Sequence, residues 1–138
     1  MHTKSKSETH ILVLSKGEEV VSKIISYCKR RNLKSAWING IGAISEVELA
    51  LYDLSSKKYH NKKLSEPLEL LSLTGNVAML KGEQVAHLHI ILSNNHMFAF
   101  GGHLVSACVS ATCEIRLEEI DIPLERRHSD EIGLNLII

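Results

Sequence analysis

The chain has 138 residues, of which 44% are hydrophobic and 23% charged, and its 16 basic residues balance 16 acidic ones. This composition is that of one globular domain long enough to bury a core, and the charge balance leaves no overall field to attract nucleic acid or an anionic membrane. No apolar run approaches the roughly 18 residues of a membrane span. Three cysteines, which match no disulfide or zinc-finger pattern, are expected to be free thiols of a cytoplasmic protein: Cys28, Cys108 and Cys113.

The N-terminal quarter predicts a tail, a strand and a helix. Residues 1–9 are charged and hydroxylic, and we expect a disordered tail. His10–Leu14 is predicted to be a strand. Ser15-Lys16-Gly17-Glu18 has the spacing of a capping box, and the apolar residues of Glu18–Arg31 recur at helical spacing. The sequence therefore predicts a helix that ends in a basic turn, with Asn32 as its C-cap.

The rest of the chain predicts strands joined by short turns. Asn39–Ala43 is predicted to be a turn, and it lacks the third glycine and following helix of a nucleotide-binding loop. Lys57–Lys63 is expected to be a polar hairpin, and Gly75-Asn76 a bulge or bend. Strands are predicted at Ser35–Ile38, Val47–Tyr52, Leu68–Ala78, Val85–Leu92, Met97–Phe100 and Leu104–Ile120. This pattern predicts an α/β fold of the α+β type, with a mainly antiparallel sheet and one or two packed helices. We expect the chain to form a single domain, residues 1–138, in which residues 118–138 are a C-terminal extension.

Two histidines in one predicted strand indicate a metal site. His87 and His89 are two residues apart, so their imidazoles project from one face of the strand about 7 Å apart at Cα and can converge on one ion. His103 follows two glycines that let the backbone approach closely, and it is the candidate third ligand. Three imidazoles suit zinc and leave a fourth position open. The alternative is that all three are ordinary surface or core histidines. The remaining histidines have no comparable arrangement: His2, His10, His60, His96 and His128.

Catalytic and nucleic-acid signals are sparse. No GxSxG, P-loop or HExxH motif occurs, so no catalytic residue is predicted. Glu69 and Glu114 lie in apolar strands, where burial would raise their pKa values and make them carboxylate bases. The alternative, which we favour, is that they face solvent or form salt bridges. Few aromatic residues and no basic stripe offer a surface for nucleic acid, and Lys29-Arg30-Arg31 is explained by the end of a helix.

Several short segments together resemble a known family. They are Gly40-Ile41-Gly42-Ala43 with the strand after it, Glu69–Asn76 (ELLSLTGN), His87-Leu88-His89, Gly101-Gly102-His103 and Ala111–Ile115. In this order, from about His10 to Leu117, the chain resembles the plant- and prokaryote-conserved (PPC) domain, which is commonly labelled DNA-binding. The resemblance implies an α/β fold with a mainly antiparallel sheet and a homotrimer. Stand-alone prokaryotic members of this family are associated with a bound metal, usually zinc, so the resemblance also implies a metal on His87, His89 and His103.

Plant members of the PPC family carry an AT-hook of the Arg-Gly-Arg-Pro type, and this chain contains none. We therefore expect a trimeric metal-binding domain with a candidate regulatory role, whose partner is DNA, bound weakly, or a protein, but not a membrane. The alternatives are a metal-dependent enzyme or small-molecule-binding protein with an open three-histidine zinc site, or a structural zinc trimer. Independently of the family, the strand Leu104–Ile120 offers more β surface than one helix covers, which favours self-association.

Overall fold

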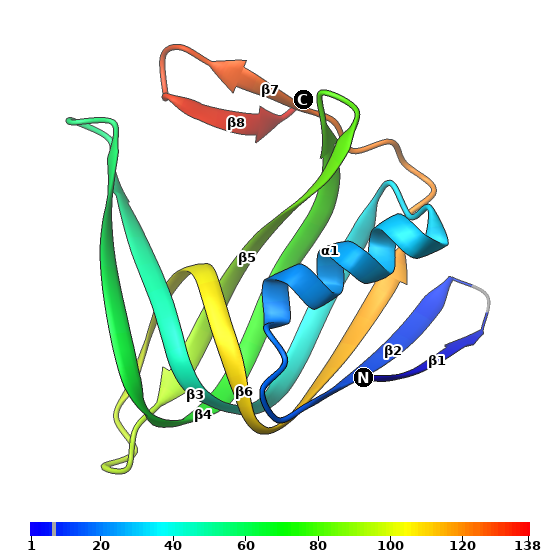
Figure 1. Cartoon of the computed structure of the whole chain (residues 1–138). Coiled ribbons are helices and arrows are strands. Elements are labelled where there is room, and N and C mark those ends of the chain that lie inside the picture. The colour runs from blue at the N-terminus through cyan, green and yellow to red at the C-terminus, as the bar shows by residue number, and fades with distance from the viewer. Residues whose placement is uncertain (7) are drawn as a thin grey trace.

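A six-stranded antiparallel sheet, in the order β1-β2-β6-β3-β4-β5, is the framework of the molecule (Figure 1). The computed structural model describes residues 1–6 and 8–138. The strands are β1 (His2–Lys6), β2 (Thr9–Ser15), β3 (Ala36–Asp53), β4 (Lys58–Leu80), β5 (Glu83–Ser93) and β6 (Ala99–Glu119). The start of β6 also pairs with β5, so that β3, β4, β5 and β6 close into a ring. The predicted mainly antiparallel sheet and single domain are confirmed.

One helix, α1 (Val20–Arg31), packs against β5 and β6. It begins after the predicted start, because Glu19 is the N-cap and its carboxylate accepts hydrogen bonds from the backbone of Val21 and Ser22. Glu18 does accept the predicted bond from the Ser15 backbone, but this contact closes the turn before the helix. Asn32 caps the other end in the left-handed conformation, as predicted. Within the described residues, no helix has the length and apolar character that crossing a membrane requires.

The core is formed by side chains of α1 and of one face of the sheet. Strand alternation places every second side chain of β2 and of the second half of β6 in this core. Its fully buried members include Leu12, Leu14, Val20, Ile24, Ile38, Leu73, Leu88, Ile90, Ile115 and Leu117. Cys28 and Cys113 are buried and Cys108 is half-buried, and all three are free thiols, as predicted.

The predicted turn at Asn39–Ala43 is wrong, because β3 continues through these residues without a break. Register shifts in the pairing of β3 lie next to Gly42, so the segment bends the strand without ending it. A Cβ atom at Gly42 would lie 2.7 Å from Cα of Cys113 on β6. The glycine therefore serves the close approach of two paired strands, a role that the sequence pattern did not distinguish from a turn.

Two further predictions about β4 differ from the structure. The polar segment Lys57–Lys63 is mostly strand, since residues from Lys58 onward pair with β3 and only the short turn before them is a hairpin loop. Its side chains are polar because this two-stranded arm is exposed. The bulge expected at Gly75-Asn76 lies instead between Leu70 and Ser72, and Gly75 pairs regularly with both neighbouring strands. One strand, β6, replaces the two predicted strands Met97–Phe100 and Leu104–Ile120, and it begins only at Ala99, after Met97 and Phe98.

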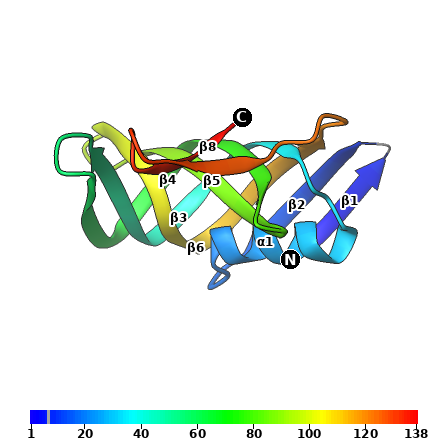
Figure 2. The same ribbon diagram turned by 90° about the horizontal axis from the view of Figure 1, so that it is seen from above.

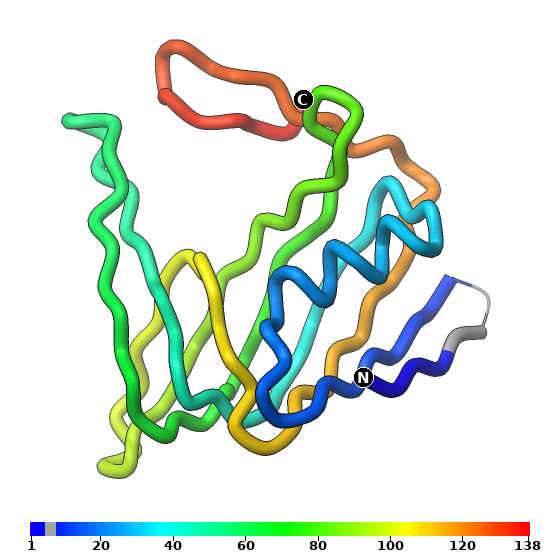
Figure 3. Tube along the Cα trace, in the orientation of Figure 1, coloured from blue at the N-terminus to red at the C-terminus, as the bar shows by residue number. Residues whose placement is uncertain are grey.

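Both chain ends form strands. The expected disordered tail differs from the structure, in which His2–Lys6 pairs with β2 at the edge of the sheet (Figure 3); Ser7 lies outside the described residues. Without β1, the backbone groups of β2 on that side would be unpaired, and the polar side chains of β1 do not prevent the pairing. The C-terminal extension folds into a second, two-stranded sheet of β7 (Arg126–Ser129) and β8 (Leu134–Ile137). This hairpin lies between the tip of β3–β4 and the β4–β5 turn (Figure 1).

Candidate metal centre

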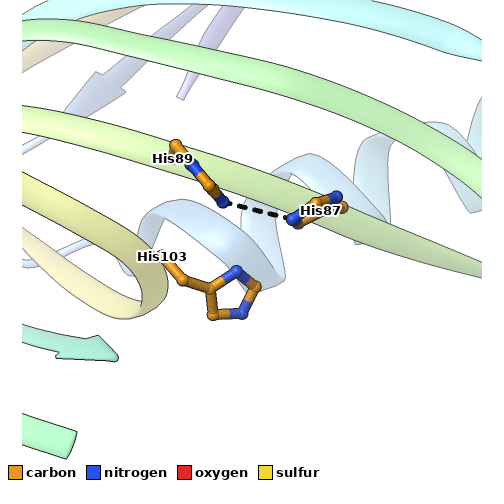
Figure 4. Close-up of side chains that lie close together, drawn as sticks. All are labelled: His87, His89 and His103. Atoms are coloured by element: carbon orange, nitrogen blue, oxygen red, sulfur yellow. Dashed lines mark hydrogen bonds between the residues drawn. The ribbon is translucent and has the colours of Figure 1, made fainter. Parts of the chain in front are cut away.

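Three histidines from two paired strands lie together (Figure 4). On β5, Leu88 and Ile90 are buried in the core, so the alternating His87 and His89 project from the opposite face of the strand. His103 lies on β6 directly across from His89 in the β5–β6 ladder. Strand alternation and register, with no loop involved, therefore bring the three imidazoles to one place.

The distances fit a single ion. The Nε2 atoms of His87 and His89 are 3.2 Å apart, and one ring nitrogen from each of the three histidines lies within 4.8 Å of the others. A tetrahedral ion with bonds of about 2.1 Å holds its nitrogen ligands about 3.4 Å apart. Small side-chain rotations would bring the third ring to this separation. The donor set suits zinc or a similar divalent metal, and it leaves coordination positions open.

The local electrostatics favour the neutral form of His87 and His103, which is the form that binds a metal. Burial is the main cause that lowers the pKa of His87 to about 4, with further contributions from Arg126, His103 and His89. Burial also lowers the pKa of His103, and His89 adds to this effect. At neutral pH both rings therefore present an unprotonated nitrogen. The ring of Tyr59 packs against His103 at a centroid distance of 5.3 Å and limits its orientation.

A cavity of about 460 Å³ adjoins His87 and His103, between the sheet and the C-terminal hairpin. Tyr59 and residues of β7 and β8, among them Arg126 and His128, complete its wall. The Arg126 guanidinium donates to Oδ1 of Asn76 over 2.7 Å, and Asn76 lies directly opposite His87 in the β4–β5 ladder. Sequence reasoning missed these residues. No short motif contains them, and only the fold-back of the last strands places them beside the histidines.

The other polar residues considered from the sequence, Glu69, Glu114 and His10, lie outside the cluster of three histidines. Glu69 and Glu114 are exposed and line a shallow hollow with Ile41 and Leu71, and none of the three clustered histidines takes part in it. They therefore fit the solvent-facing interpretation. His10 is buried and its Nδ1 lies 2.9 Å from the Tyr27 hydroxyl, which gives it a structural role in the core.

The sequence profile of the Plants and Prokaryotes Conserved (PCC, also written PPC) domain matches residues 1–121. The chain belongs to this family. The match ends before β7, so the hairpin that walls the cavity lies outside the PCC profile. No match was found among curated proteins.

Several solved structures of prokaryotic proteins are similar over nearly the whole chain. A protein from Bacteroides thetaiotaomicron, provisionally named DNA-binding, is 30% identical with a TM-score of 0.96, covering 99% of this chain and 96% of that one. A PPC protein from Pyrococcus horikoshii is 33% identical with a TM-score of 0.88, covering 99% and 93%. A protein from Archaeoglobus fulgidus, described as metal-containing, is 31% identical with a TM-score of 0.90, covering 100% and 99%.

Proposed function

We propose that this protein is a homotrimeric metal-binding domain that holds zinc or a similar divalent ion on His87, His89 and His103. The observation that carries the proposal is the grouping of three imidazole nitrogens within 4.8 Å of one another. The metal-containing relative from Archaeoglobus fulgidus supports it, as do the lowered pKa values that leave two of the rings unprotonated. When bound, the metal would act as a Lewis acid toward a ligand at an open position.

Elemental analysis of the purified protein tests the metal. We expect about one zinc or similar ion per chain in the wild type, and loss of that metal in a variant that combines His87→Ala and His89→Ala. The matched control is His60→Ala, because His60 is exposed on the β3–β4 arm and is not part of the cluster. A wild-type protein without stoichiometric metal, even after incubation with zinc, would contradict the proposal.

The role of the domain is proposed to be regulatory, through a partner. The relative from Bacteroides thetaiotaomicron, provisionally named DNA-binding, supports nucleic acid as that partner. The balance of basic and acidic residues in this chain favours a weak contact with DNA, or a protein as partner. A cytoplasmic location belongs to the same proposal, since three free thiols suit a reducing compartment.

The second candidate is a metal-dependent enzyme or small-molecule-binding protein. The cavity of about 460 Å³ beside His87 and His103 favours it, because small-molecule sites have volumes of about 300–1,000 Å³. A structure of the metal-loaded protein separates the candidates. A fourth protein ligand on the metal would indicate a structural ion, whereas an open position that faces the cavity would favour ligand binding.

A further inference from the structure

Arg126 is a half-buried cation, and no counter-ion for its charge lies among the residues that the structure describes. Its Nη2 donates to Oδ1 of Asn76 and its Nη1 donates over 3.0 Å to the backbone oxygen of Asn135. Both acceptors are neutral. The Nε–H is buried and has no acceptor among the described residues, and no ion pair of those residues involves Arg126. A guanidinium in such a place is unfavourable unless an anion accompanies it.

The position of this cation is fixed beside the candidate metal centre. Asn76, which holds the guanidinium, and His87 are cross-strand partners, so their Cβ atoms are about 5 Å apart on one face of the sheet. Arg126, His87 and His103 all line the same cavity. A divalent ion on the histidines would add positive charge next to Arg126. The two charges together require an anionic occupant more strongly than either alone.

The wall of the cavity indicates what kind of anion fits. No aspartate or glutamate lines it, so nothing in the wall neutralises Arg126. Most of the rest of the wall is apolar and consists of Leu80, Val85, Ala86, Leu134 and Leu136. An inorganic anion would leave this apolar surface uncovered, whereas an organic acid would cover it. Carboxylates also match the planar donors of arginine.

The hairpin that carries Arg126 is fastened at both ends, so the cavity has a fixed roof. The Tyr52 hydroxyl on β3 donates over 2.7 Å to the backbone oxygen of Ile132, and the Lys57 ammonium donates to the backbone oxygen of Asp130. On the other side, the backbone of Met79 on β4 donates to the Leu124 oxygen over 2.8 Å. Seen from above, the hairpin crosses over β4 and β5 (Figure 2). An anchor held in this way is preorganised for a ligand.

We propose that the cavity binds a small organic carboxylate, whose charge is held by Arg126 and whose apolar part lies against Leu80 and Leu134. This ligand class deepens the proposed function and rests on it for the contribution of the metal. Arg126 belongs to the chain and is present without the metal, so part of the affinity for the carboxylate should remain in metal-free protein.

The test is a titration of zinc-loaded protein with benzoate, measured by calorimetry and by amide and guanidinium NMR signals. Benzamide is the uncharged control, and inorganic phosphate tests whether any anion suffices. We expect benzoate to bind, to shift the Nε–H signal of Arg126 and the side-chain amide of Asn76, and to bind more tightly than either control. In Arg126→Met the dissociation constant should rise about tenfold or more, since a charge-assisted hydrogen bond is lost.

Arg127→Met is the matched control, because Arg127 is the next residue of β7 and is exposed. It should bind benzoate like the wild type. Arg126→Lys, which keeps the charge but not the planar set of donors, should bind benzoate with intermediate affinity. It replaces Arg126→Met as the test variant if Arg126→Met melts at a much lower temperature than the wild type. Equal losses in the two methionine variants, or no shift of the Arg126 signal in wild-type protein, would overturn the inference.

The same titration on metal-free protein separates this inference from the proposed function. Residual benzoate binding that depends on Arg126 would support the carboxylate site even if no metal is found. If zinc is bound in stoichiometric amount but benzoate binds equally well to the wild type and to Arg126→Met, the proposed metal centre would be supported and the carboxylate site refuted.

Discussion

Glu18 is the acidic side chain that fixes the turn leading into α1. Its carboxylate accepts a 2.8 Å hydrogen bond from the Ser15 backbone and lies 2.9 Å from the Lys23 ammonium; the amino group of Met1 lies 3.0 Å away. These donors lower the pKa of Glu18 to about 2, the Ser15 backbone bond contributing most. Because the folded pKa lies below the ordinary value, this carboxylate stabilises the fold above about pH 4.5. The stabilisation is lost as the pH falls toward 2.

Replacing Glu18→Gln should therefore lower the free energy of unfolding at pH 7 by about 1 kcal/mol, a modest value because the ion pairs are partly solvated. The difference from wild type should shrink as the pH falls from about 5 to 2. Urea unfolding across that range measures it. Glu66→Gln, at an exposed position, is the control and should change little. A difference between Glu18→Gln and wild type that is independent of pH would show that the charge of Glu18 is not involved.

The histidines and Arg126 differ in how far the sequence can predict them. His87 and His89 share a face by strand alternation alone, and the glycine pair before His103 was a further local signal. Their convergence follows from the β5–β6 register, which places His89 opposite His103. Arg126 reaches the same site only because the last 13 residues fold back over β4. Nothing in the local pattern encodes that contact, so it could not be predicted.

At the scale of elements, β3 and β4 show why strand existence was easier to predict than strand length. Alternating apolar residues marked the buried segments of both strands. Glycines and charged residues predict breaks, but β3 passes through Gly40 and Gly42, and β4 includes the polar segment that begins at Lys58. In both cases the partner strand decides the outcome, because a close neighbour requires glycine and an exposed two-stranded arm tolerates charge. Such tertiary effects are not visible in one window of sequence.

The packing of β4 against β5 depends on Gly75. Its φ of 154° is rare for other residues, and a Cβ atom there would lie 2.9 Å from Cα of Leu88 and from the carbonyl carbon of His87. Gly75→Ala should destabilise the fold by about 2 kcal/mol or more and weaken metal binding, since His87 must shift. Thermal unfolding and zinc titration measure the two effects.

Gly82→Ala is the control for Gly75→Ala. Gly82 has a φ of 85° in the β4–β5 turn, but a Cβ atom there would meet nothing within 4 Å. This variant should cost about 1 kcal/mol from backbone strain alone and should leave the metal affinity unchanged. Equal effects of the two substitutions would show that close approach of the strands is not the cause.

At the scale of the whole molecule, the described sheet exposes apolar side chains that one chain does not cover. Trp37 and Ile41 are 47% and 56% exposed on one face of β3, and Leu71 on β4 is 50% exposed. Such a patch favours self-association, and the number three comes from the resemblance to the PPC family. Light scattering should give about three times the chain mass of 15.4 kDa.

Ile41→Glu should lower that mass, because a carboxylate would be buried in the contact. Leu54→Glu, at the exposed tip of the β3–β4 arm, should leave the mass unchanged. A monomer across micromolar concentrations of wild-type protein would contradict the trimer.

The distribution of charge over the molecule argues for weak contact with DNA. The net charge is zero, and the basic runs are partly used within the chain. Lys29 pairs with Glu83 at 2.7 Å and Lys63 lies 3.6 Å from Glu48, while Arg126 is turned into the cavity. We therefore expect binding of duplex DNA, if it is detected, to show no sequence preference and to fade between about 50 and 200 mM salt. Titrations of A·T-rich and G·C-rich duplexes at both salt concentrations measure this. Tight binding at the higher salt with a preference for one duplex would contradict the expectation, since it requires contacts to base edges that this charge distribution does not indicate.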